Sequence, residues 1–217
     1  WVRVEDIFPP KTAAYIESVL KTQTPWYFVH SDETGEHKYY SRQELGSMAA
    51  SDRNAIIDGT LKRASEGFAY LYNTFPMIDF YLSGQESNWP LRSMSEFLNS
   101  QEVQKFVKMI TNEPSVVKLD AQATCYSPGH FLNTHDDTGA NAERQVAYVM
   151  GFTQDWRVDW GGQTLFLDTN GNTLRGLSPS FNTLTLFKVP RPHIVTQVST
   201  FAPRSRYSIT GWLRTDL

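Results

Sequence analysis

Residues 206–214 read RYSITGWLR, and residues 116–126 read VVKLDAQATCY. In both stretches apolar and polar side chains alternate, so an extended chain places them on opposite faces. Short β-like runs separated by Gly, Asn, Asp and Pro also cover residues 144–152, 163–167, 183–189 and 193–198. This spacing predicts a β-sandwich or jelly roll from residue 116 onward.

The N-terminal half has helical periodicity. Pro9-Pro10 precede apolar residues at three-and-four spacing, namely Ala13, Ile16, Val19 and Leu20. We expect helices at about 10–21, 41–48, 52–65 and 93–111, the second and the last with capping boxes at Ser41/Glu44 and Ser93/Glu96. Residues 68–72 and 78–81 are aromatic runs typical of strands, and Thr34-Gly35 suits a turn.

These patterns predict one domain of mainly β structure with helices (α+β). Residues 1–115 would form a helical support and residues 116–217 the β core. The helices would cover the apolar faces of the strands. The polar faces would then either meet water or line a ligand-filled barrel.

Charge and hydropathy exclude some partners. The chain has 20 basic and 23 acidic residues, a formal net charge of -3. Such a balance offers no field for gathering nucleic acid or an anionic membrane surface. No apolar stretch approaches the roughly 18 residues of a membrane span. We therefore expect neither nucleic acid nor membrane as a partner.

The cysteine content and the first residue bear on the cellular compartment of the protein. Cys125 is the one cysteine, so no intramolecular disulfide can form, and a reducing, cytoplasmic location is the simpler expectation. Trp1 stands where Met is usual, which suggests a trimmed chain and leaves a removed targeting segment open. Cys125 itself lies on an apolar strand face and is expected to be an inert core thiol.

His135-x-Asp137 places an imidazole and a carboxylate on the same side of an extended chain. His193 begins another β run, and two imidazoles with one carboxylate are the donors of the facial triad that holds non-haem Fe(II). That triad leaves three coordination positions open, whereas a structural zinc is closed by four ligands. The alternative is that His135 and His193 are ordinary barrel histidines.

Arg206 and Ser208 share one face of the last β run. A guanidinium holds a carboxylate in two parallel hydrogen bonds and a hydroxyl can add a third, which suits a dicarboxylate co-substrate. Arg204 has the same parity, so alternation alone does not choose between the two arginines. A plain surface ion pair is the alternative for Arg206.

Four motifs follow one another along the chain: Tyr126-x2-Gly129-x5-His135-x-Asp137, Gly161-Gly162-x2-Leu165, Pro192-His193-x-Val195 and Arg206-Tyr207-Ser208-Ile209-Thr210-Gly211-Trp212. In this order they resemble the Fe(II)- and 2-oxoglutarate-dependent dioxygenases, specifically the prolyl 4-hydroxylase branch. The resemblance covers about residues 120–214 and implies a double-stranded β-helix, which is a jelly roll with helices packed on one sheet.

The resemblance implies roles for individual residues. His135, Asp137 and His193 would be the iron ligands, and Arg206 would bind the distal carboxylate of 2-oxoglutarate. A tyrosine of the family that also binds this co-substrate matches Gly151 here, so its hydrogen bond is left to Tyr148, Tyr126 or Ser208. Trp212 matches an aromatic position that lines the family's pocket, and we expect it in the substrate pocket. We expect His130 there too, because it follows the loop Ser127-Pro128-Gly129.

The implied activity is hydroxylation of an aliphatic C–H bond with O2, as 2-oxoglutarate is converted to succinate and CO2. A prolyl residue of a protein or peptide is the favoured target, and ascorbate is left open as a further reductant. The alternatives are the same chemistry on another residue or a small metabolite, and a non-catalytic jelly-roll binding module. Residues 26–40 and 127–142 would form the rim of the pocket. His30 and His37 are expected on the surface, and Trp156, Trp160 and Gly161-Gly162 are expected to serve packing and turns.

Overall fold

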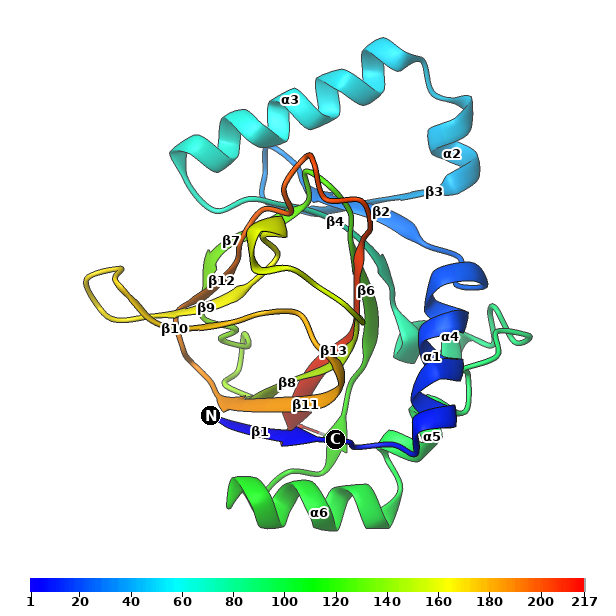
Figure 1. Cartoon of the computed structure of the whole chain (residues 1–217), viewed down its shortest axis with the longest axis vertical. Coiled ribbons are helices and arrows are strands. Elements are labelled where there is room, and N and C mark those ends of the chain that lie inside the picture. Colours follow the sequence, from blue (N-terminus) through cyan, green and yellow to red (C-terminus); the bar gives the residue numbers. More distant parts are fainter. Residues whose placement is uncertain (217) are drawn as a thin grey trace.

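The computed structural model describes residues 1–216, and its strands curl into a barrel (Figure 1). The strands are β1 (Val2–Glu5), β2 (Tyr27–Ser31), β3 (His37–Ser41), β4 (Tyr70–Phe75), β5 (Lys118–Leu119), β6 (Gln122–Tyr126), β7 (Phe131–His135), β8 (Arg144–Phe152), β9 (Thr164–Leu167), β10 (Thr173–Leu177), β11 (Phe181–Lys188), β12 (His193–Val195) and β13 (Arg206–Arg214). They pair in the order β1-β11-β8-β13-β6-β4-β7-β12-β9-β10. Beside this path, β2 pairs with β4, β3 pairs with β2, and β5 pairs with β13. This is the expected double-stranded β-helix.

The helices are α1 (Pro10–Thr22), α2 (Arg42–Ser47), α3 (Ala50–Glu66), α4 (Met77–Ser83), α5 (Met94–Leu98) and α6 (Gln101–Thr111), with a short 3-10 turn at Val158–Trp160. In Figure 1, α1, α4 and α5 stand along one side of the barrel, α3 lies beyond β2 and β4, and α6 lies beyond β1. The helices therefore cover the outside of the strands, as the periodicity predicted.

Alternation along β8 and β13 separates the core from the barrel interior. Val146, Tyr148 and Met150 join the main hydrophobic cluster, which also holds Ile16 and Leu20 of α1. The intervening side chains of β8 face the other way and meet strands from across the barrel in a second cluster. Its members are Ala147, Phe166 and Phe187, with Val149 and Trp212 packed against them. The polar residues Gln122 and Thr124 of β6 and Thr210 of β13 line a cleft, so the polar faces of these strands border an interior rather than bulk solvent.

Several predicted elements are confirmed. The predicted apolar face of α1 is buried, and Ser41 with Glu44 forms the expected capping box at α2. The turn at Thr34-Gly35 joins β2 to β3, where Gly35 has a φ of 82°. Cys125 is buried, and burial raises the pKa of its thiol. No helix within residues 1–216 is long and apolar enough to cross a membrane.

Other predictions are wrong. Residues 78–81 lie in α4 and not in a strand, because Pro76 precedes the helix and Gly84 ends it in the left-handed conformation. The helix expected at 93–111 is two helices, since Ser100 caps α6 and Ser93 makes no side-chain cap. The strand expected at 116–126 is interrupted after Leu119. Short strands β1, β2, β3, β7 and β10 were not predicted, so residues 1–115 contribute strands as well as helices.

Candidate metal centre and co-substrate site

Three candidate metal ligands converge at the barrel interior. His135 ends β7 and His193 begins β12, and the two residues are direct cross-strand partners. Asp137 follows two residues after His135, with Oδ1 3.4 Å from Nε2 of His135 and Oδ2 3.4 Å from Nε2 of His193. One ligand atom from each residue lies within 4.8 Å of the others. The predicted triad is therefore assembled by the fold.

The second nitrogen of each imidazole is already used. Nδ1 of His135 lies 2.9 Å from the carbonyl oxygen of Asn133, and Nδ1 of His193 lies 2.8 Å from that of Arg191. A carbonyl only accepts, so each Nδ1 carries the proton and each Nε2 keeps its lone pair toward Asp137. Two neutral imidazoles and a carboxylate suit a divalent transition metal with open coordination positions.

The charge state of the triad agrees with metal binding. Although burial acts against ionisation, the neighbouring His135 and His193 hold the pKa of Asp137 below its ordinary value. Burial lowers the pKa of His193, with the neighbouring His135 adding to the effect. An ionised carboxylate beside a neutral imidazole is the state that a metal ion requires.

Arg206 is a buried cation in the same cleft. Its residue is 5% exposed, and Nη1 donates to the carbonyl of Gly162 at 2.7 Å. Within residues 1–216 no carboxylate lies in salt-bridge range of its guanidinium, which instead faces the ring of Tyr126 at 5.1 Å. Burial lowers its pKa. A buried charge is costly without a partner, so this guanidinium is well suited to a bound anion.

The structure separates the two arginines that sequence parity left open. Arg204 is exposed and stacks on Trp160 at 5.6 Å, whereas Arg206 points inward. Ser208 is 1% exposed and lies on the inward face of β13, with its hydroxyl 2.7 Å from that of Thr124. Arg206 and Ser208 are thus adjacent inward-facing residues of one strand.

Tyr148 is among the residues that line the large cleft of the site, but its hydroxyl already has a partner. It shares the parity of the core residue Met150, lies in the helix-side cluster, and its hydroxyl donates to the carbonyl of Asp120 at 2.7 Å. Its hydrogen bond to a co-substrate stays a prediction. At Gly151 a Cβ would lie 2.5 Å from the carbonyl oxygen of Ser180, so no side chain fits there. Tyr126 and Ser208 stay as candidates for the missing hydrogen bond.

Two histidine predictions are wrong. His130 does not line the cleft in the described part of the chain; it packs against Phe28 with ring centroids 6.2 Å apart, and burial lowers its pKa to about 4. His30 was expected on the surface but is buried under α3, where Thr60 lies against its ring. The tight turn at 127–129 and the cover supplied by α3 are tertiary features that local patterns do not report.

A single cleft of about 980 Å³ connects the site residues. The triad, Arg206, Tyr126 and Trp212 line it, and His37 and Tyr39 lie along its outer part as the predicted rim. Tyr72 is a lining residue that the sequence reasoning did not name. Its ring stacks on Tyr126 at 5.0 Å and 13°, and burial raises the pKa of both phenols. The spacing of Tyr70 and Tyr72 on one strand face is the signal that was overlooked.

Trp156 and Trp160 serve packing, as expected. They pack against the cluster around Tyr126, and Nε1 of Trp156 donates to the carbonyl of Gly161 at 2.9 Å. Gly161 and Gly162 have φ angles of 69° and 67°, which explains the glycine pair at this turn.

Comparison with known proteins finds a family model that matches part of the chain and solved structures that share its fold. Residues 121–214 match the family model described as the 2OG-Fe(II) oxygenase superfamily. No curated protein matches the chain in sequence. Among solved structures, the chain is similar to a prolyl-4-hydroxylase from Pseudomonas putida, with a TM-score of 0.50, 16% identity and coverage of 100% of this chain and 92% of that one.

Two other structures give the same fold. An oxidoreductase of the 2OG-Fe(II) oxygenase family from Burkholderia pseudomallei has a TM-score of 0.59 and 14% identity, with coverage of 99% of this chain and 85% of that chain. A prolyl 4-hydroxylase from Phytophthora capsici has a TM-score of 0.50 and 14% identity, with coverage of 98% and 68%. These likenesses support the double-stranded β-helix for the whole chain.

Proposed function

Because residues 121–214 match the 2OG-Fe(II) oxygenase superfamily, we propose that the protein is an Fe(II)- and 2-oxoglutarate-dependent dioxygenase that hydroxylates a prolyl residue of a protein or peptide. The overall reaction takes the substrate, O2 and 2-oxoglutarate to the hydroxylated product, succinate and CO2. One oxygen atom of O2 enters the product hydroxyl and the other enters succinate.

One observation carries the proposal. Arg206 is a buried cation with no carboxylate partner within residues 1–216, and it lines the same cleft as a ready-made metal triad. A ligand that satisfies both features must bring a carboxylate to Arg206 and donor atoms to a metal. 2-Oxoglutarate does so, because its distal carboxylate and its keto-acid end lie at opposite ends of a short chain.

The residues would divide the work as follows. His135, Asp137 and His193 hold Fe(II), which when bound supplies the activation of O2. Arg206 binds the distal carboxylate of 2-oxoglutarate, and Ser208 and the Tyr126 hydroxyl are placed to add hydrogen bonds. Phe166 and Phe187 pack behind His193 and exclude water from the interior side of the site.

The prolyl target rests on the structural neighbours and on the shape of the cleft. Two of the neighbours are named prolyl 4-hydroxylases. The cleft continues from the triad to exposed residues on both sides, including Tyr39 at 48% and Leu82 at 76% exposure. An extended peptide can lie across such an open cleft, whereas a small metabolite favours an enclosed cavity.

The test is a paired-peptide assay. The Fe(II)-loaded protein is incubated with O2, 2-oxoglutarate and a library of proline-containing peptides, each matched to the same peptide with alanine in place of proline. We expect succinate formation together with a mass gain of one oxygen on prolyl peptides only. His135→Ala is the inactive control, and parallel runs with and without ascorbate test the reductant that the sequence left open.

Other results separate the alternatives. Hydroxylation of the alanine peptides at another side chain, or turnover with small metabolites alone, would contradict the prolyl target but keep the oxygenase. Absence of 2-oxoglutarate turnover with every substrate class, together with partner binding that survives His135→Ala and chelator, would instead favour the non-catalytic binding module.

A further inference from the structure

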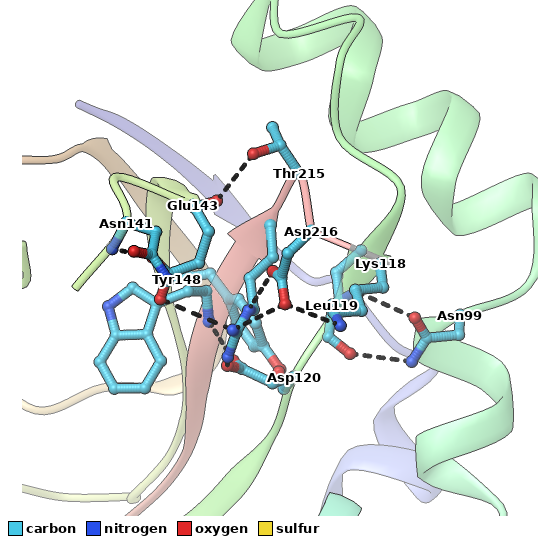
Figure 2. Close-up of polar contacts among 11 residues, drawn as sticks. Asn99, Lys118, Leu119, Asp120, Asn141, Glu143, Tyr148, Thr215 and Asp216 are labelled. Carbon is cyan, nitrogen blue, oxygen red and sulfur yellow. Dashed lines mark hydrogen bonds and ion pairs between the residues drawn. The ribbon is translucent and has the colours of Figure 1, made fainter. Parts of the chain in front are cut away.

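Arg214, the last residue of β13, is surrounded by three carboxylates (Figure 2 shows this cluster). It donates Nε and Nη2 to the two oxygens of Asp216 at 2.8 and 2.9 Å, and Nη1 to Asp120 at 3.2 Å. Glu143 completes the set, with Oε1 3.6 Å from Nη2. Lys118 adds a second cation 3.0 Å from Asp216. None of these residues belongs to the candidate metal triad, although Lys118, Asp120 and Arg214 line the same cleft.

Asp120 connects this cluster to Trp212. Its Oδ1 accepts the backbone N–H of Trp212 at 2.6 Å while Oδ2 accepts from Arg214. The backbone of Asp120 passes so close to β13 that a Cβ on Gly211 would lie 2.1 Å from its carbonyl oxygen. Arg214 therefore fixes a carboxylate that in turn fixes the backbone of Trp212.

Trp212 is held on both sides beside the triad. The guanidinium of Arg144 lies 3.7 Å from the centroid of its ring. Its ring packs against the cluster of Ala147, Phe166 and Phe187, and the ring of Phe187 lies 4.9 Å from that of His193. Any shift of Trp212 would thus be felt at a metal ligand.

Glu143 connects the same cluster to the loop that carries Asp137. Its backbone carbonyl accepts from both N and Oγ1 of Thr215, at 3.0 and 3.3 Å, and its Oε2 accepts from the backbone of Asn141 at 3.0 Å. At the other end of this loop, Asp137 has a φ of 63°. A non-glycine residue in that conformation is strained and persists only when its surroundings hold it.

We propose that Arg214 is a positioning residue of the active site, which acts through Asp120 and Glu143 to hold Trp212 and the Asp137 loop in the geometry that binds the metal. The inference rests on the proposed metal site. It assigns to residues 214–216, together with Lys118, Asp120 and Glu143, a role as a clasp that fastens two parts of the site; Lys118, Asp120 and Arg214 themselves line the cleft.

The test is titration with Mn(II), followed by the electron paramagnetic resonance signal of free Mn(II), on the wild type and Arg214→Gln. We expect the dissociation constant for Mn(II) to rise about tenfold, at the lower end of the loss seen when outer partners of metal ligands are removed. Loss of a positive charge near the site would by Coulomb attraction alone strengthen binding of a dication. Weaker binding of Mn(II) to Arg214→Gln would therefore result from a change in the geometry of the metal site and not from the lost positive charge.

The chain offers a matched control in Arg157. Its guanidinium makes the same bidentate contact with a carboxylate two residues later in the chain: Nε donates to Oδ1 of Asp159 at 3.0 Å and Nη2 donates to Oδ2 at 2.7 Å. This pair does not line the cleft. Arg157→Gln should leave Mn(II) affinity within twofold of the wild type. Arg214→Lys should recover part of the affinity, because an ammonium can still pair with one carboxylate.

The outcomes are distinguishable. Equal Mn(II) affinity in the wild type and Arg214→Gln, or equal losses in Arg214→Gln and Arg157→Gln, would overturn the positioning role. Absence of any His135-dependent Mn(II) site in the wild type would overturn the proposed function instead. If Arg214→Gln does not fold, Asp120→Asn keeps an acceptor for the Trp212 N–H but replaces the oxygen that accepts from Arg214 by an NH2 group, and the same weakening is expected from it.

Discussion

Arg206 is the residue whose charge most needs a ligand. It is buried with one protein acceptor, the carbonyl of Gly162, so the protein without co-substrate carries an uncompensated guanidinium. Truncating one partner of a buried, hydrogen-bonded charge pair costs roughly 2–5 kcal/mol of binding. Replacing Arg206 should therefore lower the affinity for the proposed co-substrate and at the same time raise the stability of the ligand-free protein.

Arg206→Gln should weaken 2-oxoglutarate binding by about 2–5 kcal/mol, measured by calorimetry on the Mn(II)-loaded protein. The same change should leave the thermal stability of the ligand-free protein unchanged or raised, since it removes a buried charge. Arg204→Gln is the matched control on the same strand parity, and its exposed side chain predicts no effect on affinity. Equal affinity of Arg206→Gln and wild type would contradict the assignment.

His130 should limit stability in acid. Burial lowers its pKa to about 4, whereas an unfolded histidine titrates near 6.5. As the pH falls from 6.5 to 4 the unfolded state binds the proton first, so the folded state loses about 3 kcal/mol from this residue. Denaturant unfolding of the metal-free protein at pH 7 and 4.5 checks this. His130→Leu should have the flatter pH dependence; identical dependence in both proteins would refute the buried neutral imidazole.

For single residues, strand parity and motif spacing in the sequence predicted which side chains point into the barrel and which belong to the candidate site. The inward direction of Arg206 and Ser208 follows from alternation once the barrel exists. Asp137 lies beyond the end of β7 with a φ of 63°, so its contact with His135 depends on the geometry of the loop and not on alternation. Tyr148 has the parity of the helix-covered face, so alternation argued against it. The covering of His30 by α3, and the packing of His130 away from the cleft, depend on contacts between segments far apart in the chain.

Among the elements, β13 carries the site. Its inward residues meet the co-substrate position and its end belongs to the clasp. Long strands with strict alternation, such as β8 and β13, were predictable, and so was the amphipathic α1. The short strands β1, β7 and β10 have too few residues to show a period, and they are stabilised by pairing with distant partners.

The crossing of Asp120 over β13 predicts a large effect at one glycine. Gly211→Ala would place a Cβ 2.1 Å from the Asp120 carbonyl, so the backbone must move, at a cost of about 1–3 kcal/mol in unfolding free energy. Gly46→Ala is the control, because no atom lies within 4 Å of its ideal Cβ and alanine favours the helix there. Chemical denaturation measures both. Equal stability of the two variants would contradict the close crossing.

The whole molecule divides the cleft between its two halves. The barrel core supplies the triad, Arg206 and Trp212, while β3 and β4 from the N-terminal half supply His37, Tyr39 and Tyr72. The N-terminal half therefore lines part of the cleft and is not only a support. This arrangement could not be predicted from the sequence, because β2 and β3 join the barrel only through β4.

Tyr39 should then act on the peptide and not on 2-oxoglutarate. Tyr39→Ser removes an exposed aromatic side chain at the outer part of the cleft, and we expect KM for a peptide substrate to rise several-fold, about 1 kcal/mol, with KM for 2-oxoglutarate unchanged. Tyr15→Ser is the control, since Tyr15 is similarly exposed at 52% on α1 but lies outside the cleft. Unchanged peptide KM in Tyr39→Ser would argue against an extended substrate along this side.

The most direct test of the whole account is anaerobic addition of Fe(II) and then 2-oxoglutarate to wild type, His135→Ala and Arg206→Ala. We predict the visible charge-transfer band of the metal chelate in the wild type, no band in His135→Ala, and a band in Arg206→Ala only at far higher 2-oxoglutarate. A wild-type protein without the band, or a band that persists unchanged in His135→Ala, would contradict the proposed metal and co-substrate site.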